Sequence, residues 1–178
     1  MRYTVNAVGG KPGVTQTRRA ETLACVCDLA RGSPLHAQMP VGSLIGMLDS
    51  PMDLKQVKAY FNDYGDSMGY VVWALLAPDV ERRFLAGKDF SLHWTEWNEG
   101  TSLWIIDFVV QRGSLAYVLR DLRDKLFKDF DTVTYFRVKN GKRIAKQVNR
   151  ADGGHFFRNQ QTRTVAQSPE SFPNIVSG

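Results

Sequence analysis

Apolar residues in the first part of the chain recur at helical spacing. From Arg18 onward they stand at i, i+3, i+4 and i+7, which places them on one face of a helix: Leu23, Val26, Cys27 and Ala30. Gly32 then stands where the residue that follows a helix commonly lies. Residues 1–17 hold glycine, proline and small polar side chains without such a period, so we expect a flexible leader there.

The next apolar runs have the pattern of strands. Residues 56–63 and 70–77 are two such runs, and the glycine-containing segment 64–69 between them predicts a β-hairpin. Pro78 and Gly87 bracket a short predicted helix, because proline suits the first helical position and glycine the residue after the last. The apolar residues near 41–48 are expected to be buried, but their pattern does not decide between helix and strand.

Residues 102–110 form an apolar run that one aspartate interrupts, which predicts a central strand buried on both faces. Helical spacing returns after it: Leu115, Val118, Leu119, Leu122 and Leu126. Residues 132–138 predict a further strand, and Asn140 followed by Gly141 signals a turn before the segment 144–150. This order of elements predicts an α/β (α+β) fold with a mixed central sheet flanked by helices. Residues 159–178 lack periodicity and predict a flexible tail, so residues 18–158 are the expected domain.

Charge narrows the class of partner without naming it. The 178 residues include 23 Lys and Arg against 18 Asp and Glu, a formal charge of +5. This balance favours an acidic partner, such as DNA, RNA, an anionic membrane surface or an acidic carrier protein. One stretch has basic residues and no acid: Arg137, Lys139, Lys142, Arg143, Lys146 and Arg150. It is either a solvated hairpin or a docking surface for an anionic partner.

The cysteines and the start of the chain indicate a reducing compartment. Cys25 and Cys27 are too close along a helix to bridge each other, and the N-terminal residues lack the apolar core of a secretory signal. No apolar run approaches the ~18 residues of a membrane-spanning helix. We therefore expect a cytoplasmic protein without a transmembrane segment. His93 and His155 have no second ligand at metal spacing, so no metal site is predicted.

The segment "RGSPLHAQMP", residues 31–40, is the first candidate for chemistry. Ser33 is a good N-cap and Pro34 suits the first helical position, which would place His36 inside the first turn of a new helix. The helix dipole disfavours an imidazolium there, so we expect a neutral ring that can act as a general base. Alternatively, His36 merely packs under the loop and Ser33 is only a cap.

The second candidate is Asp107. In a strand of period 2 it shares a face with Leu103, Ile105 and Val109, so its carboxylate points where apolar side chains point. Burying an unpaired carboxylate is costly, and Asp107 must therefore have a partner. That partner is either an arginine in an internal ion pair or a histidine that the carboxylate orients.

The loop "QRGSLA", residues 111–116, joins the predicted strand to the next helix. A glycine turn at this place can present backbone N–H groups to a phosphate or an oxyanion, which makes Gly113 and Ser114 candidates. An ordinary β–α connection explains the same residues, and no Walker or G-x-G-x-x-G pattern is present. The tryptophans are expected in the core and in pocket walls: Trp73, Trp94, Trp97 and Trp104.

Three segments together carry a resemblance to a known family. They are "SPLH" after an N-terminal helix, "YVVWA" in the hairpin, and "LWIIDFVVQRG" as a strand before a helix. They resemble the toxin-activating lysine acyltransferases that partner RTX haemolysins and leukotoxins. The resemblance runs over about residues 21–155 and includes the "RV…GK" and "GG" elements near 137–154.

The resemblance implies a cytoplasmic enzyme with a fold similar to the GNAT acetyltransferases. It implies transfer of a fatty acyl chain from acyl carrier protein (ACP) to internal lysine ε-amines of an RTX protoxin, with acyl-ACP as donor substrate and no cofactor. Related enzymes can also form a homodimer. The GNAT phosphate loop is only partly matched by "QRGSLA", which fits a carrier-protein donor more than bound CoA.

Site residues follow from the same resemblance. The family's essential histidine falls on His36 and its essential aspartate on Asp107, and further activity-sensitive positions match Ser33, Ser91 and Gly100. His36 would then remove the lysine proton or carry the acyl group transiently, and Asp107 would orient the ring. A backbone N–H at Gly113 or Ser114 would bind the oxyanion. The acyl tail could occupy an apolar channel formed by Trp73, Trp94, Trp104 and Phe108.

Two other functions stay open on the residues alone. One is an N-acyltransferase of similar fold that uses acyl-CoA on a different acceptor. The other is a non-enzymatic basic module that binds nucleic acid through residues 137–150, with a steep dependence on salt. This module gives no role to His36 or to Asp107, so we expect no nucleic-acid partner.

Overall fold

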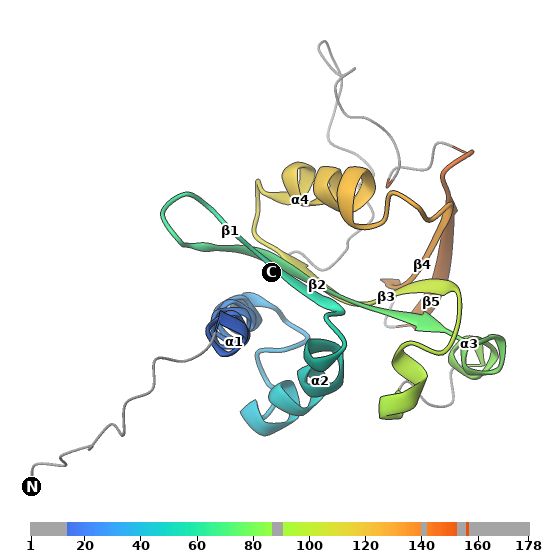
Figure 1. Ribbon diagram of the computed structural model, residues 1–178, viewed down its shortest axis with the longest axis horizontal. Helices are drawn as coiled ribbons and strands as arrows, with labels where there is room; N and C mark the ends of the chain where they lie inside the picture. Colours follow the sequence, from blue (N-terminus) through green and yellow to red (C-terminus); the bar gives the residue numbers. More distant parts are fainter. Residues whose placement is uncertain (1–13, 87–90, 140–141, 153–155, 157–178) are drawn as a thin grey trace, which may run out of the picture.

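The computed structural model describes residues 14–86, 91–139, 142–152 and 156. A five-stranded sheet runs through the molecule, with its strands side by side in chain order (Figure 1). The pair β3–β4 is parallel and the other three pairs are antiparallel. The predicted α+β fold with a mixed sheet is therefore confirmed, and it is consistent with a GNAT-like architecture.

The elements are as follows, in chain order: α1 (Val14–Gly32), α2 (Val41–Asp53), β1 (Val57–Phe61), β2 (Ser67–Leu76), α3 (Pro78–Leu85), the 3-10 helix η1 (Trp94–Trp97), β3 (Ser102–Val110), α4 (Leu115–Asp121), the π-helical turn η2 (Leu122–Leu126), β4 (Thr132–Lys139) and β5 (Lys142–Asn149).

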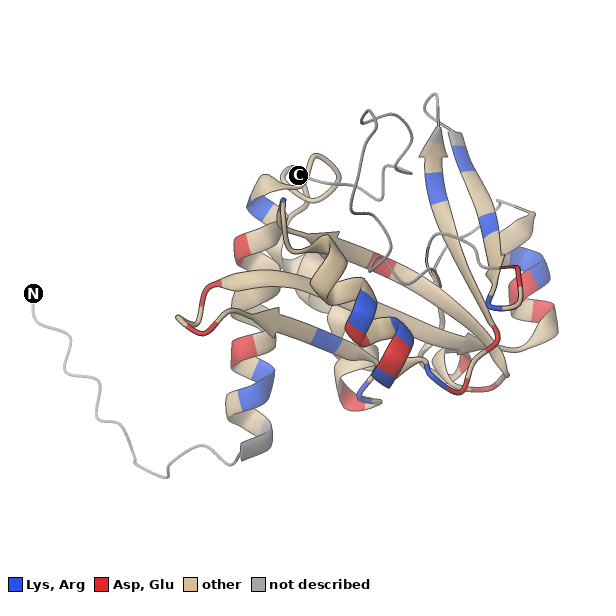
Figure 2. Ribbon diagram, turned by 90° about the horizontal axis from the view of Figure 1, so that it is seen from above, with Lys and Arg blue, Asp and Glu red and all other residues tan. Residues whose placement is uncertain are grey.

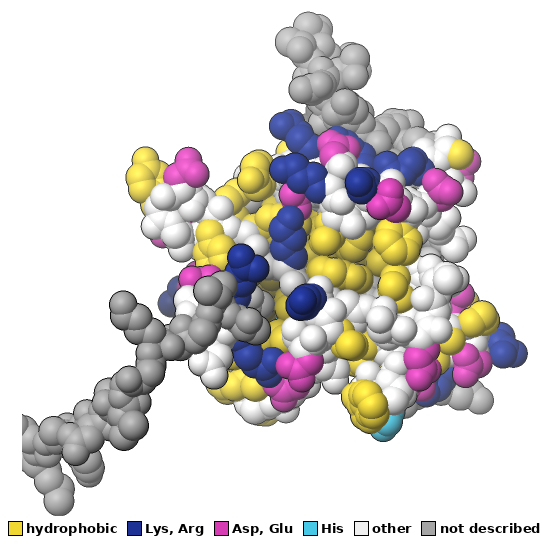
Figure 3. All heavy atoms as spheres, viewed as in Figure 1, with side chains coloured by type: hydrophobic (Ala, Val, Ile, Leu, Met, Phe, Trp, Pro, Cys, Tyr) yellow, Lys and Arg dark blue, Asp and Glu magenta, His cyan; other side chains and the backbone are white. Residues whose placement is uncertain are grey.

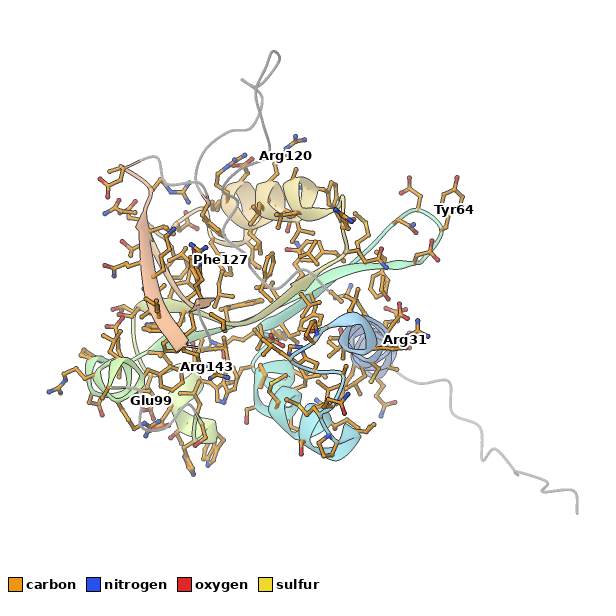
Figure 4. All side chains as sticks on the ribbon, turned by 180° about the vertical axis from the view of Figure 1, so that it is seen from behind. Arg31, Tyr64, Glu99, Arg120, Phe127 and Arg143 are labelled. Atoms are coloured by element: carbon orange, nitrogen blue, oxygen red, sulfur yellow. The ribbon has the colours of Figure 1, made fainter. Side chains whose placement is uncertain are left out.

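Two hydrophobic layers hold the sheet. α1 and α2 cover one face, and α4 covers the other (Figure 1). In the first layer, Val26 and Leu48 contribute fully buried side chains from the two helices. In the second layer, Val118 and Phe127 pack on the opposite face, and Figure 4 shows Phe127 between α4 and the sheet. Because both faces are covered, β3 carries buried side chains on both faces, as predicted, although Ile106 and Asp107 in its middle are only partly buried.

Most predicted elements are confirmed in the described residues. The hairpin is β1–β2, the helix that starts at Pro78 is α3, and the undecided apolar segment 41–48 is helical, in α2. α1 begins at Val14, inside the predicted leader, and it includes Gly32 as its last residue. The rest of the leader, the Asn140–Gly141 turn, His155 and the predicted tail lie outside the described residues.

A β-bulge in β3 decides where Asp107 points. In the antiparallel pairing with β2, Val72 lies opposite Asp107 and Trp73 lies opposite Ile105, so Ile106 is the extra residue. One extra residue exchanges the two faces of the strand beyond it. Asp107 therefore shares the α1 face with Trp104 and Val109. The expectation that it shares a face with Leu103 and Ile105 was wrong, because strict alternation ignores the bulge.

Candidate active site

The turn that follows α1 carries Ser33 and His36. The Ser33 carbonyl accepts hydrogen bonds from the His36 amide at 3.0 Å and from the Ala37 amide at 2.8 Å. These bonds close one helical turn before Pro40, in agreement with the turn of helix predicted at this place. The Ser33 hydroxyl does not cap a backbone N–H. It lies 2.8 Å from Nδ1 of the His36 ring.

This turn continues the buried face of α1. Leu29 and Ala30 are buried near the end of the helix, and the next positions at the same spacing are Ser33 and His36. Ser33 is 0% exposed and His36 is 7% exposed, although the residues between them are exposed. The spacing therefore turns two polar side chains toward the sheet, where each needs a hydrogen-bond partner.

Asp107 contacts His36 on the α1 face of the sheet. His36 Nε2 lies 3.1 Å from Asp107 Oδ2, and the Phe108 amide donates to Oδ1 at 2.9 Å. The hydroxyl of Tyr70 donates to Oδ2 at 2.7 Å. Of the two partners considered from the sequence, an arginine or a histidine, the structure places the histidine beside this carboxylate.

The electrostatics of the ring differ from the prediction. The hydrogen bond to Asp107 raises the pKa of His36 above its ordinary value, against the opposing effect of burial. The expectation that a helix dipole keeps the ring neutral was wrong, because only one helical turn forms and the Asp107 carboxylate lies against the ring. The neutral ring therefore becomes a stronger base than an ordinary histidine.

The contacts also assign a role to each ring nitrogen. A carboxylate only accepts hydrogen bonds, so Nε2 carries the proton that faces Asp107. In the neutral ring Nδ1 is then the acceptor, and the Ser33 hydroxyl donates to it. Ser33, His36 and Asp107 thus form a hydroxyl–imidazole–carboxylate chain. In many acyl-transfer sites this connectivity allows the imidazole to accept the proton of the hydroxyl, while the carboxylate orients the ring.

The other predicted site residues lie elsewhere. Ser91 precedes η1, and its carbonyl accepts from Arg83 at 3.0 Å. Gly100 follows η1 and its amide donates to the Leu75 carbonyl at 2.9 Å, at the far end of β2 from Tyr70. These contacts place both residues near α3, which Figure 1 shows at the other end of the sheet from α1.

The loop after β3 contains the two predicted oxyanion donors. Gly113 has a positive φ of 94°, a backbone conformation that favours glycine. The Ser114 amide donates to the Gln111 carbonyl at 3.0 Å, so the turn itself uses this N–H. Binding of an oxyanion by Gly113 or Ser114 stays a prediction.

The aromatic residues suggested for an acyl channel do not line one surface. Trp104 is buried on the α1 face, where it packs against Phe84, whereas Trp73 and Phe108 lie on the opposite face. Trp94 is 67% exposed on η1. These four side chains therefore cannot form a single channel in this conformation.

A cavity of about 300 Å³ is lined by sequence neighbours of Ser33 and Asp107, although Ser33, His36 and Asp107 themselves do not line it. It lies between the C-terminal ends of α1 and β3, and Gly32 and Val109 in its wall are close in sequence to Ser33 and Asp107. Its remaining lining combines apolar and polar side chains: Asp28, Leu29, Arg31, Val110 and Gln111. Figure 4 labels Arg31 at the end of α1. The sequence offered no signal for this cavity, because its two walls meet only in the folded chain.

Sequence reasoning also missed Tyr70. This tyrosine stands in the "YVVWA" segment, where it reads as an ordinary strand residue. A signal was present nonetheless, since a tyrosine among buried apolar positions must find a partner for its hydroxyl.

The described part of the chain has neither a metal-binding cluster nor a membrane-spanning helix. It holds no group of three or more His, Cys, Asp or Glu side chains arranged to bind a metal ion. Among the same residues, no helix is both long enough and apolar enough to cross a membrane.

Comparison with known proteins shows the family to which the chain belongs. RTX-II toxin-activating lysine-acyltransferase ApxIIC of Actinobacillus pleuropneumoniae is 24% identical over 145 residues, which cover 82% of this chain and 88% of that protein. Lysine-acyltransferase RtxC of Vibrio cholerae serotype O1 is 23% identical over 114 residues, 64% of this chain and 74% of that protein. The model of the RTX toxin acyltransferase family matches residues 15–151, from α1 through β5. This match covers most of the chain, which therefore belongs to the RTX toxin acyltransferase family and is an acyltransferase.

Proposed function

We propose that this protein transfers a fatty acyl chain from acyl carrier protein to internal lysine ε-amines of an RTX protoxin. The observation that carries the proposal is the buried Ser33–His36–Asp107 chain in a member of this family. The two relatives are named as lysine-acyltransferases, one of them toxin-activating. We place the enzyme in the cytoplasm, where acyl carrier protein is available and thiols stay reduced.

Lysine acylation needs a base because the amine is protonated at neutral pH. With a reference pKa near 10.4, exposing the neutral amine at pH 7 costs roughly 4–5 kcal/mol. His36 is the proposed base, and the raised pKa of its ring supports this role. Asp107 stabilises the imidazolium that forms, through the contact between Oδ2 and Nε2.

The proposed proton path runs through Ser33. Because Nε2 faces Asp107, the nitrogen that accepts the new proton is Nδ1, which the Ser33 hydroxyl contacts. Ser33 would pass its own proton to Nδ1 and receive the proton of the amine. The amine nitrogen then bonds to the acyl carbon and releases its second proton to solvent, the carbon–sulfur bond of the thioester breaks, and the leaving thiolate takes the first proton from His36.

An acyl-histidine intermediate is the alternative chemistry for the same residue. It requires a ring nitrogen that can attack the thioester directly. In this structure Nδ1 faces Ser33 and Nε2 faces Asp107, and the ring is 7% exposed. The geometry therefore favours the base role.

The hairpin β4–β5 is the proposed contact for the acidic carrier protein. Its strands bear Lys and Arg and no acidic residue (Figure 2). Arg150, just beyond β5, has a structural role instead: its guanidinium donates to the carbonyls of Phe127 at 3.0 Å and Phe130 at 3.2 Å. On the α4 side of the molecule, basic and acidic side chains are mixed, which favours the hairpin (Figure 3). Electrostatic complementarity would speed the encounter with the carrier.

The cavity beside the site is the proposed approach for one of the two substrates. Its volume of about 300 Å³ is at the small end of the range for ligand pockets. Its mixed lining suits a chain with an apolar stem and a polar end, which describes both a lysine side chain and the thioester end of the donor.

The test combines donor choice with matched variants. Purified protein is incubated with palmitoyl-ACP or palmitoyl-CoA and an RTX protoxin, and acyl-lysine is read by peptide mass spectrometry. We expect transfer from the carrier protein by the wild type and loss of transfer in His36→Ala and Asp107→Ala, with comparable thermal melts. Full activity in His36→Ala would refute the mechanism, and transfer from CoA alone would replace the proposed donor. Sedimentation of the same sample tests for a homodimer.

A further inference from the structure

Two tyrosines in neighbouring strands are both buried and both donate their hydroxyl to an aspartate, on opposite faces of the sheet. Tyr60 of β1 is 5% exposed and Tyr70 of β2 is 0% exposed. The hydroxyl of Tyr60 donates to Asp121 Oδ2 at 2.9 Å, and that of Tyr70 donates to Asp107 Oδ2 at 2.7 Å. Only the second aspartate also contacts a histidine. Comparing Tyr60 with Tyr70 therefore distinguishes the effect of a buried tyrosine hydroxyl on the fold from its effect on the site.

The bulge in β3 brings Tyr70 and Asp107 together. Tyr70 pairs with Val109 and Val72 pairs with Asp107, so Tyr70 and Asp107 are diagonal neighbours on the α1 face. Without the extra residue, Asp107 would point to the other face, where Tyr70 could not reach it. The bulge therefore places Asp107 Oδ2 within reach of both the Tyr70 hydroxyl and His36 Nε2.

We propose that Tyr70 is a positioning residue that fixes the Asp107 carboxylate against His36. A carboxylate with a single anchor can rotate about its Cβ–Cγ bond, and the contact with Nε2 would then vary. Here the Phe108 amide holds Oδ1 and the Tyr70 hydroxyl holds Oδ2, so the plane of the carboxylate is fixed from both ends. Tyr70 acts through Asp107 and has no contact of its own with the ring among the hydrogen bonds described.

Packing in the core does not explain why the residue at position 70 carries a hydroxyl. On the same face of β2, the following buried residues are Val72, Ala74 and Leu76, all apolar. A phenylalanine at position 70 would fill the same volume without the cost of burying a hydroxyl. The hydroxyl is therefore best explained by its hydrogen bond to Asp107.

The groups around the pair decide the direction of the effect. The titratable side chains that act on Tyr70 are Asp107 of β3 and Cys25 and Cys27 of α1, and burial with the nearby carboxylate raises the pKa of the Tyr70 hydroxyl. The hydroxyl thus stays a donor. When it is removed, the Phe108 amide still holds Oδ1, but Oδ2 interacts with the imidazolium alone, and the attraction between them increases.

The inference is tested by titration of the His36 ring in the full chain, followed by NMR. The chain has three histidines, and the His36 signals are identified by their loss in His36→Gln. We expect the His36 titration of Tyr70→Phe to lie about 0.5–1 pH unit above that of the wild type, the equivalent of one lost hydrogen bond. Tyr60→Phe is the matched control and should leave the titration in place. Equal titrations in wild type and Tyr70→Phe, or equal shifts in both variants, would overturn the inference.

A double variant shows whether Tyr70 acts through Asp107. In the Asp107→Asn background, Tyr70→Phe should add no further shift to the His36 titration. A shift of the same size in that background would mean that Tyr70 acts on the ring by another route. If Tyr70→Phe does not fold, site-specific 3-fluorotyrosine at position 70 keeps the hydroxyl and strengthens its hydrogen bond. The His36 titration should then move downward, and no movement would overturn the inference.

A kinetic measurement on Tyr70→Phe is a second test, and this test alone rests on the proposed function. In acyl transfer, Tyr70→Phe should lower kcat roughly tenfold to a hundredfold with KM within about twofold, because the base is misplaced while the substrate sites are intact. Tyr60→Phe should change neither. If the wild type transfers no acyl group from any donor, the proposed function fails, and the NMR titration still decides the role of Tyr70.

Discussion

Ser33 Oγ and Asp107 Oδ2 lie against opposite nitrogens of the His36 ring, at 2.8 Å from Nδ1 and 3.1 Å from Nε2. The first contact is made within one turn of the chain, and the second joins the turn after α1 to the third strand of the sheet. Each side of the ring can therefore be changed separately by mutation.

Removing the Ser33 hydroxyl isolates the Nδ1 side. We expect Ser33→Ala to lower kcat by about a hundredfold, the lower range for loss of a proton-transfer step, since the lysine proton loses its path to the ring. Ser43→Ala on the exposed side of α2 is the control and should be neutral. Steady-state kinetics with varied acceptor separate kcat from KM. A wild-type kcat in Ser33→Ala would contradict the proposed proton path.

Acid pH should inactivate the enzyme through His36. The Asp107 contact raises the pKa of the ring, so the neutral base appears only as pH rises through a value above the ordinary 6.5. The acid limb of kcat/KM should therefore lie above pH 6.5. In Asp107→Asn it should move downward, because burial then lowers the pKa without an opposing carboxylate. A limb that stays in place in Asp107→Asn would show that another group titrates.

The same ionisation also affects stability, with the opposite sign. A raised pKa in the folded state means that the charged His36–Asp107 pair stabilises the fold below pH 6.5, and that this contribution is lost as pH rises through the folded pKa. Chemical denaturation of the wild type and His36→Gln at several pH values measures it. The difference in the free energy of unfolding between the wild type and His36→Gln should decrease as pH rises from 6.5 through the folded pKa of His36.

Gly100 should be intolerant of any side chain for a steric reason. A Cβ at this position would lie 1.9 Å from the Leu76 carbonyl oxygen, so the strand end must move. Gly100→Ala should lower the free energy of unfolding by about 1–3 kcal/mol or more. Gly46→Ala is the matched change in open space and should be stabilising by up to about 1 kcal/mol, because alanine favours the helix. Denaturant titration distinguishes them, and equal effects would remove the steric explanation.

Charge reversal tests the hairpin as the contact for the carrier protein. Arg143→Glu combined with Lys146→Glu should raise KM for acyl-ACP about tenfold at low salt and much less at high salt, because the attraction is screened. Arg18→Glu on α1 changes an exposed basic residue outside the hairpin and should have little effect. Arg150→Ala should lower thermal stability instead, since it removes the donor to the Phe127 carbonyl. A KM insensitive to the double reversal would exclude this surface.

The cavity can be closed from its rim. Gln111 is exposed and lines the cavity, so Gln111→Trp should obstruct it without disturbing the core. We expect kcat/KM to fall at least about tenfold for the one substrate that enters there. The substrate whose KM changes, donor or acceptor, identifies the occupant. Gln16→Trp at the exposed start of α1 is the control, and unchanged kinetics in Gln111→Trp would exclude this route.

The sequence predicted the elements more fully than their relationships. Period and turn residues located the hairpin, α3 and the central strand, since each depends on neighbours in the chain. The pair His36 and Asp107 came from the resemblance together with the cost of an unpaired buried carboxylate. The prediction of which residues share a face with Asp107 was right for Val109 and wrong for Leu103 and Ile105. The reason is that no residue in "WIIDFVV" signals the bulge at Ile106. Tyr70 and the cavity depend on contacts between strands and helices distant in sequence, and no periodic pattern records those.

The strands lie side by side in chain order, and the site is complete only when β3 has joined the sheet. α1 and the Ser33–His36 turn leave the ribosome well before β3, and domains of this size fold cooperatively once their partners are present. A nascent chain that ends before β3 has the histidine and the serine but no carboxylate to raise the basicity of the ring. We therefore expect acyl transfer to become available only when β3 has paired with β2.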